Sequence, residues 1–104
     1  MSNYKITNYS KEKAKDLNVK IKPSSNPKKK IDVFDKNNKL IVSIGAFGYK
    51  DYPTYLKDDK ALAEKKRKAY KARHEKDRHI KGSAGYYADQ ILWWVVFYLI
   101  IIYI

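Results

Sequence analysis

An uninterrupted apolar run at one end constrains this sequence more than any other feature. Each of the fourteen residues 91–104 is apolar or aromatic, whereas the start of the chain is rich in Lys, Asn and Ser. As a helix, the run would reach about 21 Å, short of the roughly 30 Å of hydrocarbon that a membrane span crosses. Extension back to Tyr86 gives about 28 Å, but that longer segment includes Asp89 and Gln90.

Three interpretations of the apolar run stay open. The first is membrane contact, because its ten Leu, Ile, Val and Phe residues contribute roughly −3 to −6 kcal/mol to insertion. The second is burial against other subunits, and the third is a shifted reading frame near the end of the gene. The predicted membrane contacts are the first ten residues of the run: Ile91, Leu92, Trp93, Trp94, Val95, Val96, Phe97, Tyr98, Leu99 and Ile100.

Length and composition limit what the rest of the chain can build. With 104 residues there is room for one small domain, and such a domain buries only about 60 to 65% of the surface that its unfolded chain exposes. The chain has no cysteine, which excludes disulfides and thiolate zinc sites. A large enclosed active site is therefore not expected.

Positive charge is concentrated in two blocks. The 23 Lys and Arg residues against 11 Asp and Glu residues give a net charge of +12. Residues 1–30 carry +7 and residues 57–81 carry +6, whereas residues 31–56 between them are neutral. This charge exceeds what solubility requires and predicts an acidic partner: nucleic acid, an anionic membrane surface or an acidic face of another protein.

The first block is predicted to be a disordered basic arm. Residues 1–30 contain only Ile6, Leu17, Val19 and Ile21 as large aliphatic residues. Such a segment buries too little apolar area to offset the entropy lost on ordering. We therefore expect a flexible arm that ends in three consecutive lysines.

Residues 31–44 carry the clearest pattern in the chain, that of a β-hairpin. Apolar residues alternate before the connection at Ile31 and Val33, and after it at Leu40, Val42 and Ile44. Asp and Asn in the connection tolerate the positive φ of a tight turn. Because a lone hairpin is only marginally stable, another element has to cover its apolar face.

A connector rich in Gly and Tyr follows the hairpin. Tyr49, Tyr52 and Tyr55 are predicted to pack between the hairpin and the next element, with tight backbone at Gly45 and Gly48. The ten tyrosines of the chain are also candidates for stacking on single-stranded nucleic acid. Aromatic residues beside glycines more often pack a core or an interface.

Residues 58–79 are predicted to form one helix, since good helix formers dominate and no Gly or Pro occurs before Gly82. At 100° per residue, one face collects the apolar residues, although Lys66 and Arg73 interrupt it. Its members are Leu62, Ala63, Ala69, Tyr70, His74 and Ile80. The opposite side is predicted to carry a cationic stripe of Lys60, Arg67, Lys71 and Arg78.

The predicted anion contacts combine this stripe with the lysines at the end of the arm. They are Lys28, Lys29, Lys30, Lys60, Arg67, Lys71 and Arg78. Such residues neutralise phosphates in a sequence-tolerant way. The competing interpretation is a solvated helix face on which Glu64, Glu75 and Asp77 pair with neighbouring basic residues.

No motif for catalysis or metal binding stands out. His74 and His79 lie about 140° apart around a helix axis, so they cannot easily share a metal ion. The sequence has no nucleophile elbow and no carboxylate pair, and Gly45 and Gly48 lack the following Lys-Ser/Thr of a phosphate loop. We therefore expect no enzymatic activity, no cofactor and no small-molecule substrate.

Five short blocks occur in a distinctive order: IGA at 44–46, GYKDY at 48–52, YKARH at 70–74, SAGYY at 83–87 and ILW at 91–93. With the lysine-rich lead-in at Lys28, this order resembles a family of small, basic, uncharacterised proteins encoded by large and giant DNA viruses. The resemblance covers about two thirds of the chain. It implies a viral source, and a location in the virion or the infected cell, rather than a mechanism. After Trp93 the sequence departs from the family pattern, in which a polar, proline-containing stretch follows.

These patterns predict an α+β fold in which a small β-hairpin packs with one basic helix. The expected parts are a disordered arm (1–30), a hairpin–helix module (31–90) and an apolar tail (91–104). The expected function is that of a virus-encoded, non-enzymatic structural or accessory protein whose cationic surface contacts nucleic acid or acidic virion components. The alternative is a C-terminally anchored membrane protein whose basic cytoplasmic domain lies against anionic lipid.

Overall fold

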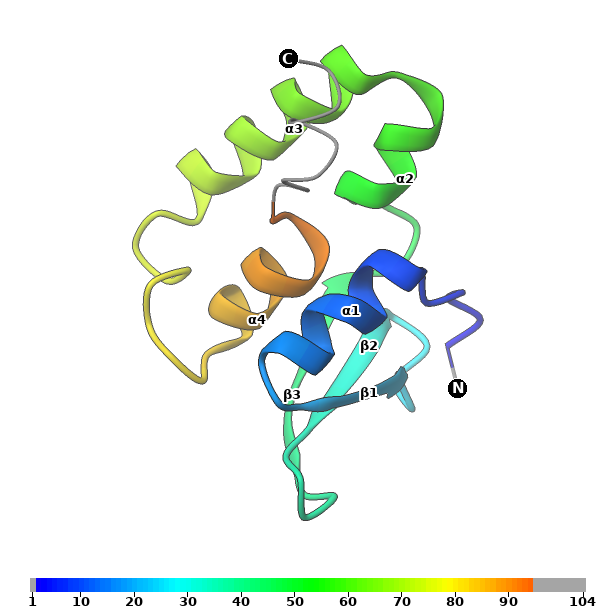
Figure 1. The fold of residues 1–104 in the computed structure, drawn as a ribbon, viewed down its shortest axis with the longest axis vertical. Coiled ribbons are helices and arrows are strands. Elements are labelled where there is room, and N and C mark those ends of the chain that lie inside the picture. Colours follow the sequence, from blue (N-terminus) through cyan, green and yellow to red (C-terminus); the bar gives the residue numbers. More distant parts are fainter. Residues whose placement is uncertain (1, 95–104) are drawn as a thin grey trace.

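The computed structural model describes residues 2–94, which form four helices and a three-stranded sheet. The α+β class predicted from the sequence is thereby confirmed. In chain order the elements are α1 (Asn8–Asp16), β1 (Lys20–Pro23), β2 (Lys29–Phe34), β3 (Leu40–Ala46), α2 (Tyr52–Asp58), α3 (Lys60–Arg73) and α4 (Ala84–Leu92). Helix α4 packs on β3, α1 packs on α4 and β1, and α2 and α3 pack on each other (Figure 1).

The sheet is antiparallel, with β2 in its centre. Strands β2 and β3 form the predicted hairpin, in which Ile31 lies opposite Ile44 and Val33 opposite Val42. Ile31, Val33 and Ile44 are buried in the hydrophobic core. Because side chains alternate across a strand, Asp32 points to the other face, where it is buried as well.

Gly45 near the end of β3 confirms the prediction of tight backbone at this position. It has a φ of 76°, in the left-handed region that glycine adopts without strain. A Cβ there would lie 2.9 Å from Cδ of Lys30 and 3.0 Å from Cδ1 of Leu92. Only glycine therefore lets β3 approach both side chains so closely.

Residues 1–30 contain a helix and a strand, so the expectation of a disordered arm is wrong. Thr7 caps α1 by accepting a hydrogen bond from the N–H of Ser10. The hydroxyl of Ser10 is buried and donates to the carbonyl oxygen of Ile91 at 2.9 Å, and Ala14 is buried one turn later. Six partly buried side chains of this segment pack on the core: Tyr4, Ile6, Tyr9, Leu17, Val19 and Ile21. The prediction counted aliphatic residues and left out the tyrosines and small residues that also hold this segment.

The helix predicted over residues 58–79 corresponds to α3, and a further helix, α2, occupies part of the segment predicted as a connector. Asp51 caps α2 by accepting from the N–H of Thr54, and Pro53 occupies its first turn. Asp59 has extended backbone, ends α2 and caps α3. α3 ends at Arg73, and turns replace the predicted last part of the helix.

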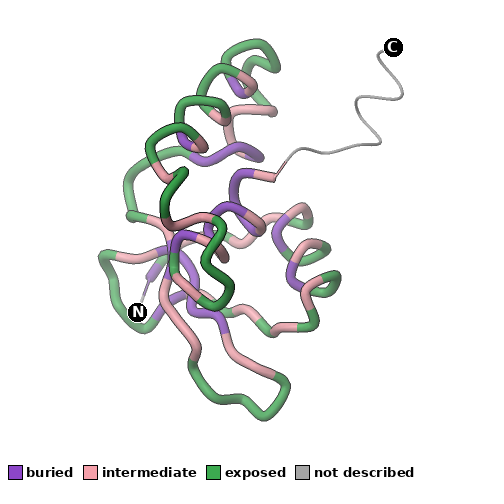
Figure 2. Tube along the Cα trace, turned by 90° about the vertical axis from the view of Figure 1, so that its left-hand side faces the viewer, coloured by how far each residue is buried: buried purple, intermediate pink, exposed green. Residues whose placement is uncertain are grey.

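The side of α3 that packs on the core differs from the predicted apolar face. The helix buries Ala63 and Tyr70, whereas Leu62 is 37% exposed. Most of its residues are exposed, in contrast to α4 and the centre of the sheet (Figure 2). The ring of Tyr70 stacks on Trp93 at 4.8 Å between ring centres. This aromatic contact decides which side of α3 faces the core.

The apolar run begins inside the hydrophobic core. Ile91 and Leu92 in the last turn of α4 are completely buried, and Trp93 after it is nearly so. They belong to the same core cluster as Ile31 and Ile44. The prediction that Ile91, Leu92 and Trp93 contact a membrane is therefore wrong, because core packing already covers these side chains.

Trp94 is partly buried at the end of the described chain. Its carbonyl oxygen accepts a hydrogen bond from the hydroxyl of Tyr9, and Nζ of Lys71 lies 4.4 Å from its ring centre. The other predicted membrane contacts, residues 95–100, lie outside the described residues. Among the helices of residues 2–94, none has the length and apolar content that a membrane crossing requires.

Candidate functional site

Lys30, one of the seven predicted anion contacts, lies in the interior. Its Nζ is 3.0 Å from Oδ2 of Asp51, and both side chains are buried. The hydroxyl of Tyr4 donates to the same oxygen at 2.6 Å, and the hydroxyl of Thr54 donates to Oδ1 at 2.7 Å. Burial, together with the neighbouring Asp51 carboxylate, raises the pKa of Tyr4, which therefore stays a protonated donor. The predicted anion contact at Lys30 is wrong, since a buried carboxylate requires this charge as its partner.

Three members of the predicted helix stripe are also paired within the chain. Arg67 and Arg78 each bind a glutamate three residues earlier, at 3.2 and 2.8 Å. Nζ of Lys71 lies 2.7 Å from Oδ1 of the buried Asp89, and Arg78 lies 3.9 Å from Oδ2 of the same residue. Pairing with Glu64 and Glu75, as in the competing interpretation, thus applies to Arg67 and Arg78, whereas Lys71 pairs with a buried acid that this interpretation did not include.

The remaining predicted contacts lie at the starts of two elements, β2 and α3. Lys28 precedes β2 and is exposed, Lys29 begins β2 and is half-buried, and Lys60 is exposed at the start of α3. Of these three, only Lys29 lines the cleft described below. The seven predicted residues therefore do not form one surface.

A different set of basic side chains covers the exposed side of α3. These residues, the α3 cationic face, are Lys65, Lys66, Lys68 and Arg73, all exposed. At 3.6 residues per turn they span an arc of about 160°. Within residues 2–94, no carboxylate forms an ion pair with any of the four. Their charges are therefore available to an external anion.

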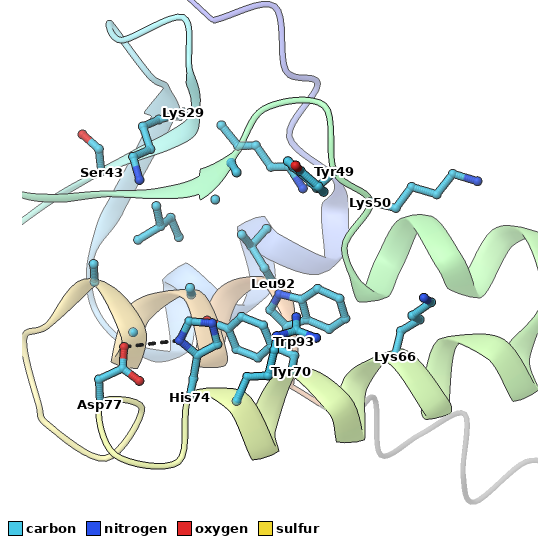
Figure 3. Close-up of a pocket in the computed structure, with 18 of the residues that line it drawn as sticks. Lys29, Ser43, Tyr49, Lys50, Lys66, Tyr70, His74, Asp77, Leu92 and Trp93 are labelled. Atoms are coloured by element: carbon cyan, nitrogen blue, oxygen red, sulfur yellow. Dashed lines mark hydrogen bonds and ion pairs between the residues drawn. The ribbon is translucent and has the colours of Figure 1, made fainter.

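A cleft of about 650 Å³ lies beside this face, between β3 and helices α3 and α4. Residues 43–46 of β3 form one wall, and Tyr70, His74 and Trp93 stand on the opposite, helical wall (Figure 3). Tyr49, in the loop after β3, lies on the strand side of the cleft and is 75% exposed.

The exposure of Tyr49 corrects one sequence expectation for the connector tyrosines. Tyr49 was predicted to pack between the hairpin and the helix, yet its ring is mostly open to solvent. Tyr52 is buried in the core, and Tyr55 is partly buried against it. Of the three tyrosines, Tyr49 alone offers most of its ring surface to an external partner.

The helical wall of the cleft is a ladder of aromatic rings. Tyr55 contacts Trp93 at 6.4 Å, Trp93 stacks on Tyr70 at 4.8 Å, and Tyr70 stacks on His74 at 4.3 Å. Burial, with Asp89 and Asp77 nearby, raises the pKa of Tyr70. Both faces of Tyr70 are covered, so the rings of this wall are held in place by their mutual stacking.

The cleft is strongly cationic at its rim. Lys29, Lys50, Lys66 and Arg73 line it, and Asp77 is the lining carboxylate. Lys50 and Lys66 lie 5.8 and 6.0 Å from the centre of the Tyr55 ring, within the range of a cation–π contact. Lys50 also pairs with Asp58 at 3.3 Å, but this exposed ion pair is worth only about 0–1 kcal/mol. An anionic ligand can therefore displace it.

The histidines are engaged with neighbouring acids rather than with each other. Nδ1 of His74 lies 3.4 Å from Asp77, and Nε2 of His79 lies 2.9 Å from Glu75. In the part of the chain that the structure describes, no three His, Asp or Glu side chains come together as metal ligands.

Sequence reasoning missed the α3 cationic face and the cleft because it assigned α3 the wrong orientation. Lys66 and Arg73, which interrupt the predicted apolar face, were the available signal for the error. Of the predicted apolar face, only Ala63 and Tyr70 are buried, whereas Leu62, Ala69 and Ile80 are exposed. The cleft itself has no signature in the sequence, since it is lined by strand, loop and helix residues far apart in the chain.

Comparisons with protein-family models, with curated proteins and with solved structures found no match to this chain.

Proposed function

We propose that this chain is a non-enzymatic protein that binds nucleic acid in a sequence-tolerant way, through the α3 cationic face and the rim of the adjoining cleft. The observation that carries the proposal is the set of four exposed basic side chains on one side of α3, none of them paired with a carboxylate of residues 2–94. The viral source and virion location implied by the sequence resemblance stay predictions.

The spacing of these charges suits a polyanion better than a single small anion. Lys65 and Arg73 are eight residues apart, which corresponds to about 12 Å along a helix. Duplex DNA carries one charge per about 1.7 Å of its axis, so a surface of this length meets several phosphates. Neutralising them releases counterions, which favours binding.

The chemistry of this face predicts weak discrimination between base sequences. Three of its four members are lysines, which act as flexible point charges rather than as planar, bidentate donors. Contacts to phosphates position a protein on nucleic acid but carry no sequence information. Affinity is therefore expected to depend on charge and salt more than on sequence.

The proposal is tested by removing two charges from the α3 cationic face. The double variant Lys65→Gln/Lys68→Gln is compared with Lys36→Gln/Lys39→Gln, which removes the same charge from exposed residues at the hairpin turn. Fluorescence anisotropy with a labelled oligonucleotide measures Kd. We expect about a tenfold loss for the α3 variant, because two exposed ion pairs of up to about 1 kcal/mol each together approach or exceed the roughly 1.4 kcal/mol that corresponds to a tenfold change in Kd. The hairpin variant should lose less than about twofold, as expected for side chains outside the interface.

Two results would contradict the proposal. One is an equal loss in both double variants, which would show that net charge matters and the position of the charges does not. The other is binding of full-length protein to vesicles of anionic lipid with no retention of nucleic acid, which would favour the membrane alternative.

A further inference from the structure

We infer that the cleft between β3 and helices α3 and α4 receives one unpaired base, so that the protein prefers single-stranded to double-stranded nucleic acid. This inference rests on the proposed function and adds to it the form of nucleic acid that is bound. It starts from the shape and lining of the cleft rather than from the charge of α3.

The size of the cleft suits a flat ring system. Its volume of about 650 Å³ lies within the roughly 300–1,000 Å³ typical of ligand sites. Leu92, Ala88 and Ala46 supply the apolar part of its lining. A base in a duplex is stacked and paired, so only an unpaired base can enter without the cost of breaking a pair.

Tyr49 provides the stacking surface for this base. Its ring is 75% exposed on the strand side of the cleft, opposite the aromatic ladder (Figure 3). Tyr70 cannot take this role, because His74 and Trp93 already cover its two faces. Stacking on an aromatic side chain tolerates any base, since every base has a π-face.

The edge of the base meets hydrogen-bonding groups at the strand wall. β3 lies at the edge of the three-stranded sheet, and residues 43–46 of this strand line the cleft. An edge strand carries backbone N–H and C=O groups that the sheet leaves unpaired. These groups offer both donors and acceptors to a base edge, and Nε2 of His74 adds one more polar group.

The phosphates on either side of the base meet the cationic rim. Lys29 lies on the strand side of the cleft, whereas Lys66 lies on the helical side and Lys50 near it in the loop (Figure 3). Lys66 and Arg73 belong to both the cleft and the α3 cationic face. A strand whose base occupies the cleft can therefore continue along α3 with its phosphates on Lys65 and Lys68.

The test uses full-length protein and oligonucleotides of equal length, single-stranded or duplex, that carry one 2-aminopurine. We expect tighter binding of the single strand and a change in 2-aminopurine emission on binding. Tyr49→Ala should weaken single-strand binding by at least about fivefold, the lower limit for one stacked base, and duplex binding by less than twofold. Leu40→Ala, which removes an apolar side chain that is 51% exposed at the far end of β3, is the control.

A second variant blocks the cleft without removing an aromatic ring. Ala46 is exposed and lines the cleft, so Ala46→Leu is compatible with the fold and should reduce single-strand binding in the same way as Tyr49→Ala. Equal affinity for single strand and duplex, unchanged by either variant, would overturn the cleft inference while leaving binding by α3 intact. Binding of a free mononucleotide as tight as that of the oligonucleotide would also overturn it. Absence of binding to either form would instead refute the proposed function itself.

Discussion

At the scale of single residues, the three buried carboxylates are stabilised in two ways. Asp51 forms an ion pair with Lys30 at 3.0 Å, and Asp89 forms one with Lys71 at 2.7 Å. Asp32 has no basic partner among residues 2–94 and is held by hydroxyl and backbone donors. The lysines that pair with Asp51 and Asp89 are therefore unavailable to external anions.

The surroundings of Asp32 determine its protonation. The hydroxyls of Ser24 and Ser43 each donate to Oδ1 at 2.6 Å, and the N–H of Ser25 donates to Oδ2 at 3.0 Å. Burial alone raises the pKa of this carboxyl, but the hydrogen bonds outweigh it and hold the pKa below its ordinary value. Because the pKa is lowered on folding, the ionised carboxylate stabilises the fold above the unfolded-state pKa of about 3.9. This stabilisation is lost as the pH falls through the lowered folded-state pKa.

Asp32→Asn should destabilise the protein at neutral pH by about 1–3 kcal/mol, because an amide nitrogen then faces serine donors. Urea unfolding at pH 7 and at acid pH measures the effect. The difference between wild type and variant should shrink below about pH 4. Asp58→Asn, at an exposed carboxylate, is the control and should change little. A difference of equal size at neutral and acid pH would contradict this account of Asp32.

At the scale of elements, the period of the apolar residues predicted strands better than helices. Alternation at Ile31, Val33, Val42 and Ile44 gave the β2–β3 pairing, because a strand has only two faces. A helix can pack at any rotation about its axis. Because basic residues interrupt the apolar face of α3, the sequence alone did not determine which side of this helix faces the core. The contact of Tyr70 with Trp93, 23 residues further along the chain, resolves it.

The N-terminal and C-terminal elements were misassigned because their partners are distant in sequence. α1 packs on α4, and the hydroxyl of Ser10 reaches the carbonyl of Ile91. Neither segment carries enough apolar surface in the right pattern to predict this contact by itself. Composition indicated an arm and a tail, whereas the fold packs α1 against α4.

Helix α4 gives the sharpest test of the core at this scale. Leu92→Ala should destabilise the protein by about 2–5 kcal/mol, because it leaves a cavity beside Ile31 and Ile44. Ile80→Ala, at a side chain that is 58% exposed, should cost less than about 0.5 kcal/mol. Thermal unfolding followed by circular dichroism measures both. Similar melting temperatures for the two variants would show that Leu92 is not a core residue.

At the scale of the whole molecule, a net charge of +12 is expected to attract polyanions from a distance. Under the proposed function, the fold decides where they bind. The sequence predicts this attraction, but some of the anion contacts predicted from it, such as Lys30 and Lys71, pair with buried acids of the same chain. The pairing of a basic residue depends on carboxylates brought near it by folding, so composition alone cannot locate the free charge. The α3 cationic face is one group of basic side chains that this pairing leaves without a carboxylate partner among residues 2–94.

The salt dependence of single-strand binding tests the central claim most directly. With phosphates on the four members of the α3 cationic face, a plot of log K against log salt concentration should have a slope of about −3, at about −0.7 per phosphate. In Lys65→Gln/Lys68→Gln the slope should flatten by about 1.4, to roughly half. A slope near zero in the wild type, or the same slope in wild type and variant, would contradict nucleic-acid binding by this face.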